Sequence, residues 1–266
     1  MSERVTTAMT ALGRRVLSIF SACLDLWGIF LGTLVGLLRR GRPAGEIAYQ
    51  MYVIGNKSVL FVAVTLGFIG MVMIYQSCLQ VSRITGDLSQ VGGEFAKLLT
   101  YDFAPTLTSL MLATRVGAGI AAEIGSMKVT EQIDALRMCG VRPIDYLIVP
   151  RFVAALVMTV VLSIWGAVFS FAAGALTAWS SFEVNPRVFF NLDAINYTHL
   201  TLGLIKAVTY GMAIPVISGF CGLRARGSSE GVGWATTAAV IGSSFAVIAL
   251  DFIISAAAYI TVGASL

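Results

Sequence analysis

The sequence predicts an all-α integral membrane protein that forms a single domain over residues 1–266. Hydrophobic residues make up 57% of the chain and charged residues only 12%, a composition that would not keep a domain of this length soluble in water. Several apolar runs reach the roughly 20 residues that a helix needs to cross a hydrocarbon core about 30 Å thick. None of these runs alternates with a period of two, so we expect helices and not the strands of a membrane barrel.

Five apolar runs are long enough to be transmembrane helices. They lie at about residues 59–78, 98–122, 152–179, 200–221 and 236–260. The third run is longer than a bilayer requires, so that helix must tilt, kink or protrude.

A sixth apolar run, residues 16–38, is long enough to cross the membrane, but cationic residues flank it on both sides: Arg14, Arg15, Arg39, Arg40 and Arg42. A crossing would leave one cationic cluster outside, against the positive-inside rule. We therefore expect an interfacial, elbow-like helix on the cytoplasmic surface. Gly28, Gly32 and Gly36 recur at four-residue spacing on it, a stripe that either lets another helix pack closely or has no packing role.

With this helix inside and five crossings, the N-terminus is cytoplasmic and the C-terminus periplasmic. The loop cations support this orientation, since six fall in the cytoplasmic loops and three in the external ones. The six are Lys128, Arg137, Arg142, Arg151, Arg224 and Arg226, and the three are Arg83, Lys97 and Arg187.

The segment between the second and third predicted spans, residues 123–138, is polar but amphipathic. Lys128 with Glu131, and Asp134 with Arg137, are three residues apart and would pair on one surface of a helix. We expect a short cytoplasmic helix across the ends of the spans. It is either a solvated loop element or a docking surface for a soluble partner that pushes on the spans.

The chain contains no G-x-x-x-x-G-K-[ST] loop for nucleotide phosphates. It also has a single histidine, His199, and no HExxH or GxSxG motif, which argues against an intramembrane enzyme. We therefore expect no catalytic residue and no metal site in this chain. If ATP drives transport, the motor must be another polypeptide.

The run AEIGSMKVTEQIDALRMCGVRPIDYLIVPR, residues 122–151, resembles the signature of the MlaE/YrbE permease family. This family provides the membrane subunits of ABC systems that carry MCE-type lipid-binding proteins. Three further segments look like family motifs in their usual order: GFIGMVMIYQ (67–76), GVGWATTAAVIGSS (231–244) and LDFIISA (250–256). The resemblance covers nearly the whole chain after its first residues.

The resemblance implies a permease of the bacterial inner membrane that forms a homodimer or a pseudo-symmetric dimer, with five spans, an N-terminal elbow helix and a coupling helix. It would exchange phospholipid with a periplasmic hexamer of an MCE-domain protein and so serve outer-membrane lipid asymmetry. A separate cytosolic ABC ATPase would bind ATP and Mg²⁺, so no cofactor is expected in this chain. A small STAS-type cytosolic protein is a further candidate partner, and no nucleic acid is expected, because the basic residues are dispersed.

The resemblance also implies that the coupling helix contacts the ATPase. The residues that would make this contact are Glu123, Met127, Lys128, Glu131, Gln132, Asp134 and Arg137. On the first span, flexible and aromatic side chains suit the wall of a lipid cavity, although ordinary lipid-exposed or packing positions would look the same. These are Phe68, Met71, Met73, Tyr75 and Leu79.

Four ionisable residues fall in the predicted spans: Asp102, Arg115, Lys206 and Asp251. Each costs roughly 2.5–3.5 kcal/mol at a helix centre, so each needs a reason. Arg115 either snorkels to the cytoplasmic surface or forms a structural pair. Lys206 and Asp251 have opposite charges at similar depth, which predicts an ion pair between adjacent helices.

Asp102 occupies the position where family members often carry a glutamate beside the lipid cavity. This chain has Tyr101–Asp102 where an arginine–glutamate pair is common, so the acid is kept and the base is lost. The alternative function is an ion-coupled secondary carrier of a hydrophobic substrate, in which Asp102, Lys206 and Asp251 relay protons, although no inverted repeat is evident.

Overall fold

The computed structural model describes residues 2–38, 44–84, 86–190 and 195–262, which form helices joined by turns, with no strand among them. Arg39, Arg40 and Arg42 fall outside these residues, and the side chains of Arg14 and Arg15 are not described. The helices are α1 (Ser2–Leu38), α2 (Ala44–Ile84), α3 (Val91–Leu98), α4 (Ala104–Leu112), α5 (Ala118–Val129), α6 (Gln132–Met138), α7 (Val149–Phe182), α8 (Pro186–Phe189), α9 (Tyr197–Leu223) and α10 (Ser229–Val262).

Three π-helical turns join some of these helices: η1 (Leu99–Phe103), η2 (Ala113–Gly117) and η3 (Ile144–Ile148). The first two interrupt the long helix from α3 to α5. Such turns are rare and often mark functional sites, and η1 and η2 each contain a charged residue, Asp102 and Arg115.

Six helical stretches of the described residues are long and apolar enough to cross a membrane. They are Phe20–Leu38, Gly45–Ile84, Val91–Val129, Ile144–Phe182, Tyr197–Leu223 and Ser229–Thr261. Each of the five runs predicted to span lies within one of the last five stretches, whose helices extend beyond the predicted ends. The first stretch is the run expected to be interfacial.

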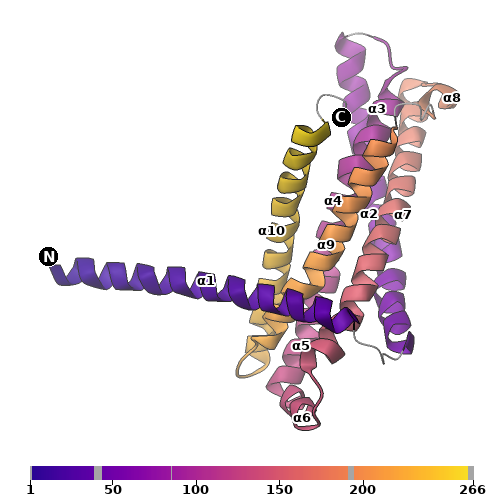
Figure 1. Cartoon of the computed structure of the whole chain (residues 1–266). Helices are drawn as coiled ribbons and strands as arrows, with labels where there is room; N and C mark the ends of the chain where they lie inside the picture. The colour runs from indigo at the N-terminus through magenta and orange to yellow at the C-terminus, as the bar shows by residue number, and fades with distance from the viewer. Residues whose placement is uncertain (1, 39–43, 85, 191–194, 263–266) are drawn as a thin grey trace.

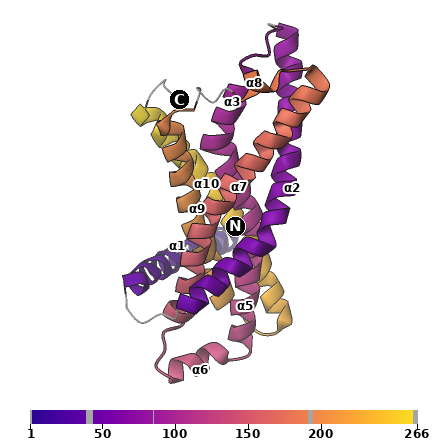
Figure 2. The same ribbon diagram turned by 90° about the vertical axis from the view of Figure 1, so that its right-hand side faces the viewer.

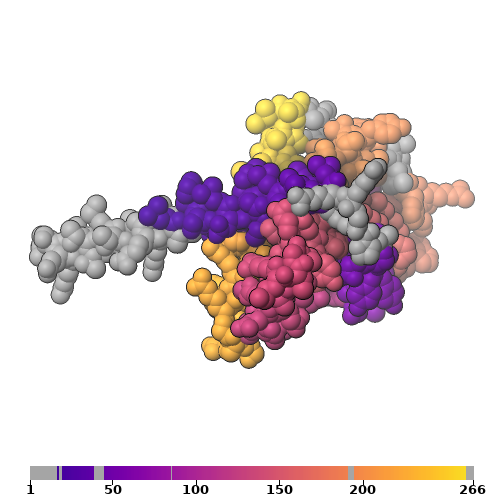
Figure 3. All heavy atoms as spheres, turned by 60° about the horizontal axis from the view of Figure 1, so that its bottom comes forward, coloured from indigo at the N-terminus to yellow at the C-terminus, as the bar shows by residue number. Residues whose placement is uncertain are grey.

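The long helices except α1 form one elongated bundle, and α1 lies across them (Figure 1). One end of the bundle carries α3 and α8, and the other carries α6; these are called the α8 end and the α6 end below (Figure 2). α10 begins near the α6 end and finishes at the α8 end. Viewed toward the α6 end, α5 and α6 stand out between α1 and the start of α10 (Figure 3).

Close helix packing depends on small residues, as expected when lipid replaces water around a bundle. α2 runs along α7, and a Cβ added at Gly70 would lie 2.3 Å from the backbone oxygen of Ser170. On α1, Gly32 and Gly36 face Ile144 and Asp145, while Gly28 has no neighbour within 4 Å. The predicted glycine stripe therefore packs over only part of its length.

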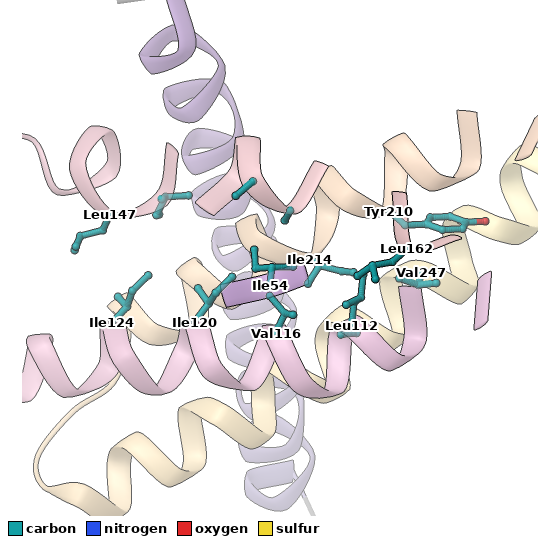
Figure 4. Packing of buried hydrophobic residues seen from close by; sticks show 14 of the residues in the cluster. Ile54, Leu112, Val116, Ile120, Ile124, Leu147, Leu162, Tyr210, Ile214 and Val247 are labelled. Atoms are coloured by element: carbon teal, nitrogen blue, oxygen red, sulfur yellow. The ribbon is translucent and has the colours of Figure 1, made fainter. Parts of the chain in front are cut away.

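The larger hydrophobic core gathers side chains that lie far apart in the sequence, among them Ile54, Leu112, Tyr210 and Val247 (Figure 4). Its fully buried members include Ile124, Ile133, Leu162 and Tyr210. A second core at the α8 end contains Phe95 of α3 and Phe189 of α8. Helices α1 and α10 are the least buried of the six long helical stretches. In their most hydrophobic segments, only 11% and 17% of the residues are buried.

Candidate functional site

The predicted coupling helix is divided into two helices. α5 ends at Val129, and Glu131 has a φ of 61°, in the left-handed region, before α6 begins at Gln132. A non-glycine residue there costs on the order of 1–3 kcal/mol and needs support from its surroundings. The structure therefore has two helices where a single helix was expected over residues 123–138. Residues 123–129 continue the preceding long helix, and only α6 changes direction.

The end of α6 is closed by a Schellman motif. The N–H of Gly140 donates to the carbonyl oxygen of Arg137 at 3.0 Å, and the N–H of Val141 donates to that of Leu136 at 3.1 Å. Gly140 has a φ of 75°, a conformation in which a side chain would be strained. The motif fixes where α6 stops.

Asp134 forms one ion pair that links α6 to α5 and a second ion pair within α6. Asp134 accepts from Lys128 at 3.0 Å and from Arg137 at 3.1 Å. The expected pair of Asp134 with Arg137 is confirmed, whereas Lys128 bonds to Asp134 and not to Glu131, because the turn at Glu131 brings the start of α6 back toward α5. The hydrogen bond from Lys128 lowers the pKa of the Asp134 carboxyl.

α6 has one packed face and one exposed face. Ile133 is fully buried, and Leu136 packs against the larger core. On the exposed side, Met138 is 91% exposed, and Val141 and Tyr146 of the following segment are also exposed. An apolar surface of this kind is typical of a protein interface; sequence reasoning missed these three residues because it counted only polar and charged contacts.

Two further ion pairs brace the α6 end. Arg151 at the start of α7 is almost fully buried and contacts Glu123 of α5 at 2.7 Å. Arg224 after α9 contacts Asp25 of α1 at 3.0 Å and lies over the Phe220 ring. Glu123, expected to contact a partner, therefore also ties α5 to α7.

A polar network joins four elements inside the bundle. Lys206 of α9 contacts both Asp102 of η1 and Asp251 of α10, the latter at 2.7 Å. The side chain of Lys206 is 2% exposed, whereas those of Asp102 and Asp251 are 30% and 24% exposed. The predicted pair of Lys206 and Asp251 is confirmed, and Asp102 joins it.

Two uncharged side chains complete this network. The hydroxyl of Tyr210 donates to Asp251 at 2.8 Å, and that of Thr106 donates to the same oxygen at 3.2 Å. Sequence reasoning missed both, although Tyr210 follows Lys206 by one helical turn and so faces the same way. A buried charge with this many partners is strongly held in place.

Arg115 is held separately from the network. Its guanidinium donates to the hydroxyl of Ser58 on α2, so it forms a structural contact between helices. His199 is buried at the start of α9, where its Nδ1 accepts from the backbone N–H of Asn196 in a capping box. This contact gives His199 a structural role at the start of the helix.

The five residues proposed for a lipid-facing wall all lie on α2, where Phe68, Met71, Tyr75 and Leu79 share one face, and their role stays a prediction. Phe68 is exposed, and the Tyr75 ring packs against that of Phe182 at 5.5 Å between centroids. Among the described cavities, one of about 460 Å³ between α2 and α3 includes Met73 in its lining but none of the other four. Met71 and Leu79 are partly buried.

Comparison with known proteins adds an independent observation. Residues 47–257 match the profile of a family described as permease MlaE. A probable ABC transporter permease of Synechocystis is 37% identical over 85% of each chain. The intermembrane phospholipid transport system permease protein MlaE of Haemophilus influenzae is 32% identical over 95% of this chain and 97% of its own. A probable ABC transporter permease of Pyropia yezoensis is 29% identical over 90% of this chain and 91% of its own.

Proposed function

This chain belongs to the MlaE permease family, and we propose that it moves phospholipid between the bacterial inner membrane and a periplasmic MCE-domain hexamer, driven by a separate cytosolic ABC ATPase. The observation that carries the proposal is the α6 end, where ion pairs link the helices and apolar side chains are exposed. ATP and Mg²⁺ bind to the ATPase. A small STAS-type protein is a further cytosolic partner.

The proposed orientation puts the α6 end in the cytosol. The cations Lys128, Arg137, Arg151 and Arg224 all lie at this end, as the positive-inside rule requires. The α8 end then faces the periplasm and the MCE partner. Because α10 finishes at the α8 end (Figure 1), the C-terminus is periplasmic.

In this arrangement α1 lies on the cytoplasmic surface as an elbow helix and does not cross the membrane. Two observations support this placement: α1 lies across the bundle, and few residues of its most hydrophobic segment are buried. The ion pair between Asp25 and Arg224 holds it at the α6 end. Five helical stretches then cross the membrane.

A second copy of the chain is proposed to cover α10. Large apolar side chains are exposed along this helix: Trp234, Ile241, Phe245, Ile248, Phe252 and Ile253. Two copies would enclose an apolar cavity that opens at the α8 end and accepts acyl chains. Closure of the ATPase would push on α6, and the ion pair between Glu123 and Arg151 would transmit that movement to α5 and α7.

The exposed surface of α6 gives the direct test. Met138→Asp places a charge on it without disturbing the core, since Met138 is 91% exposed, and should abolish co-purification of the ATPase and lipid-stimulated ATP hydrolysis. Ile84→Asp, at an apolar residue of the α8 end that is 82% exposed, is the matched control and should retain both. Normal ATPase binding by the Met138 variant would refute the proposed contact.

The buried network favours one alternative, an ion-coupled secondary carrier. Lys206 with two carboxylates could bind and release protons during transport. Proton-coupled lipid uptake by this chain alone in liposomes, with no ATPase present, would support the carrier. ATP-dependent transport that is insensitive to a proton gradient would support the permease.

A further inference from the structure

The largest described cavity lies at the α8 end, outside the buried network, between the last turns of α2 and the first turns of α3. Its volume is about 460 Å³, and Figure 1 shows α3 beside this end of α2. The residues that line it are Met73, Ser77, Gln80, Val81, Asp87, Gln90, Val91, Glu94, Phe95 and Leu98. Half of these are polar, unlike the lining of two nearly apolar hollows beside α7.

The two walls of this cavity change from apolar to polar in the same direction. On α2, the order toward the α8 end is Met73, Ser77, Gln80 and Val81. On α3, which runs back into the bundle, Glu94 and Leu98 follow the N-cap residue Gln90 at four-residue spacing and so share one face with it. The deeper part, with Met73, Phe95 and Leu98, is therefore mainly apolar, and the rim carries the polar side chains together with Val81 and Val91, which matches a ligand with an apolar tail and a polar head.

The shape of the rim is set by local contacts. Asp87 accepts from the backbone N–H of Ser89 at 2.9 Å, which lowers the pKa of its carboxyl. On the opposite side of α3, a Cβ added at Gly92 would lie 2.4 Å from the backbone oxygen of Phe189. α3 is thus packed tightly against α8, and its Gln90–Leu98 face is left to the cavity.

The charge of the rim is negative. Asp87 and Glu94 are both exposed carboxylates, and none of the described lining residues is a cation. The cations nearest in sequence, Arg83 and Lys97, are not among the lining residues. Such a rim attracts an ammonium group and repels a headgroup whose net charge is negative.

We propose that this cavity binds the headgroup of an amine-bearing phospholipid, with the ammonium at Asp87 and Glu94 and the first part of the acyl chains against Met73, Phe95 and Leu98. The inference rests on the proposed function and names the preferred substrate class. It assigns headgroup selection to the α2–α3 rim and not to the buried network of Lys206.

The test measures headgroup preference by binding alone. The purified protein is incubated with phosphatidylethanolamine and phosphatidylglycerol of identical acyl chains in equal amounts, and retained lipid is counted by native mass spectrometry. The wild type should retain more phosphatidylethanolamine. Asp87→Asn with Glu94→Gln should lower that ratio, by up to about fivefold for each carboxylate removed, since partly exposed ion pairs are worth at most about 1 kcal/mol.

Glu183→Gln is the matched control, because Glu183 is an exposed carboxylate after α7 that does not line the cavity. It should keep the wild-type ratio. An unchanged ratio in the double variant, or equal retention of both lipids by the wild type, would overturn the inference. Neither result depends on the ATPase, so failure of the proposed transport cycle would be seen separately in the Met138 variant.

Discussion

Replacing Lys206 by methionine tests how much the buried network stabilises the bundle. Lys206 is 2% exposed and contacts both Asp102 and Asp251, so its loss leaves two neighbouring carboxylates without their cation. Removing one partner of a buried pair typically costs about 3–5 kcal/mol. For a soluble chain of similar size each 1 kcal/mol lowers Tm by roughly 2–4 °C, so the expected decrease is about 6 °C or more.

The magnitudes also predict an order among variants. Asp251→Asn should cost less than Lys206→Met, about 1.5–3 kcal/mol for the lost charged hydrogen bond, because Lys206 keeps Asp102. The charge-swapped variant with Lys206→Asp and Asp251→Lys should recover part of the stability and activity that each single variant loses.

Thermal unfolding in detergent, followed by fluorescence-detected size-exclusion chromatography, gives Tm for each variant. Arg187→Met, at an exposed cation of α8, controls for loss of a positive charge. The reasoning is refuted if Lys206→Met lowers Tm no more than Arg187→Met does, or if the charge swap equals the sum of its single variants.

Two further predictions concern packing and pH. Gly70→Val should reduce the yield of folded protein, measured by the same chromatography, because its side chain would collide with the Ser170 backbone; a normal yield would show that α2 and α7 can separate. Because the pKa of Asp134 is lowered in the folded state, its contribution to stability is fully present above its unfolded pKa of about 3.9 and is lost as pH falls through the folded value. A spin label on Cys139 should therefore gain mobility below about pH 4, whereas in Asp134→Asn its mobility should not change over this pH range; equal pH dependence in both proteins would contradict this.

The positions of the long helices could be predicted because the length of an apolar run is a local property. The pair of Lys206 and Asp251 could also be predicted, since depth along each span fixes which charges meet. Asp102 could not be added to that pair, because its direction depends on the π-helical turn η1. Sequence periodicity assumes an α-helix and gives the wrong face after such a turn.

The break before α6 could not be predicted from the sequence for a related reason. Nothing in the residue type of Glu131 indicates a left-handed conformation, which glycine usually supplies, so an uninterrupted helix was the reasonable prediction. The partner of Lys128 changed with it, from Glu131 to Asp134. In contrast, glycine is the residue type that most often follows the end of a helix, and Gly140, with its positive φ, does so after α6.

The side of the membrane on which α6 lies tests the account most directly. Cys139, directly after α6, is exposed and can be labelled by a membrane-impermeant thiol reagent in a variant that lacks the other exposed cysteine, Cys23. Labelling should occur in inverted membrane vesicles and not in intact spheroplasts, with Arg187→Cys giving the opposite pattern. Labelling of Cys139 from the periplasmic side would put α6 beyond the reach of any cytosolic ATPase and contradict the account.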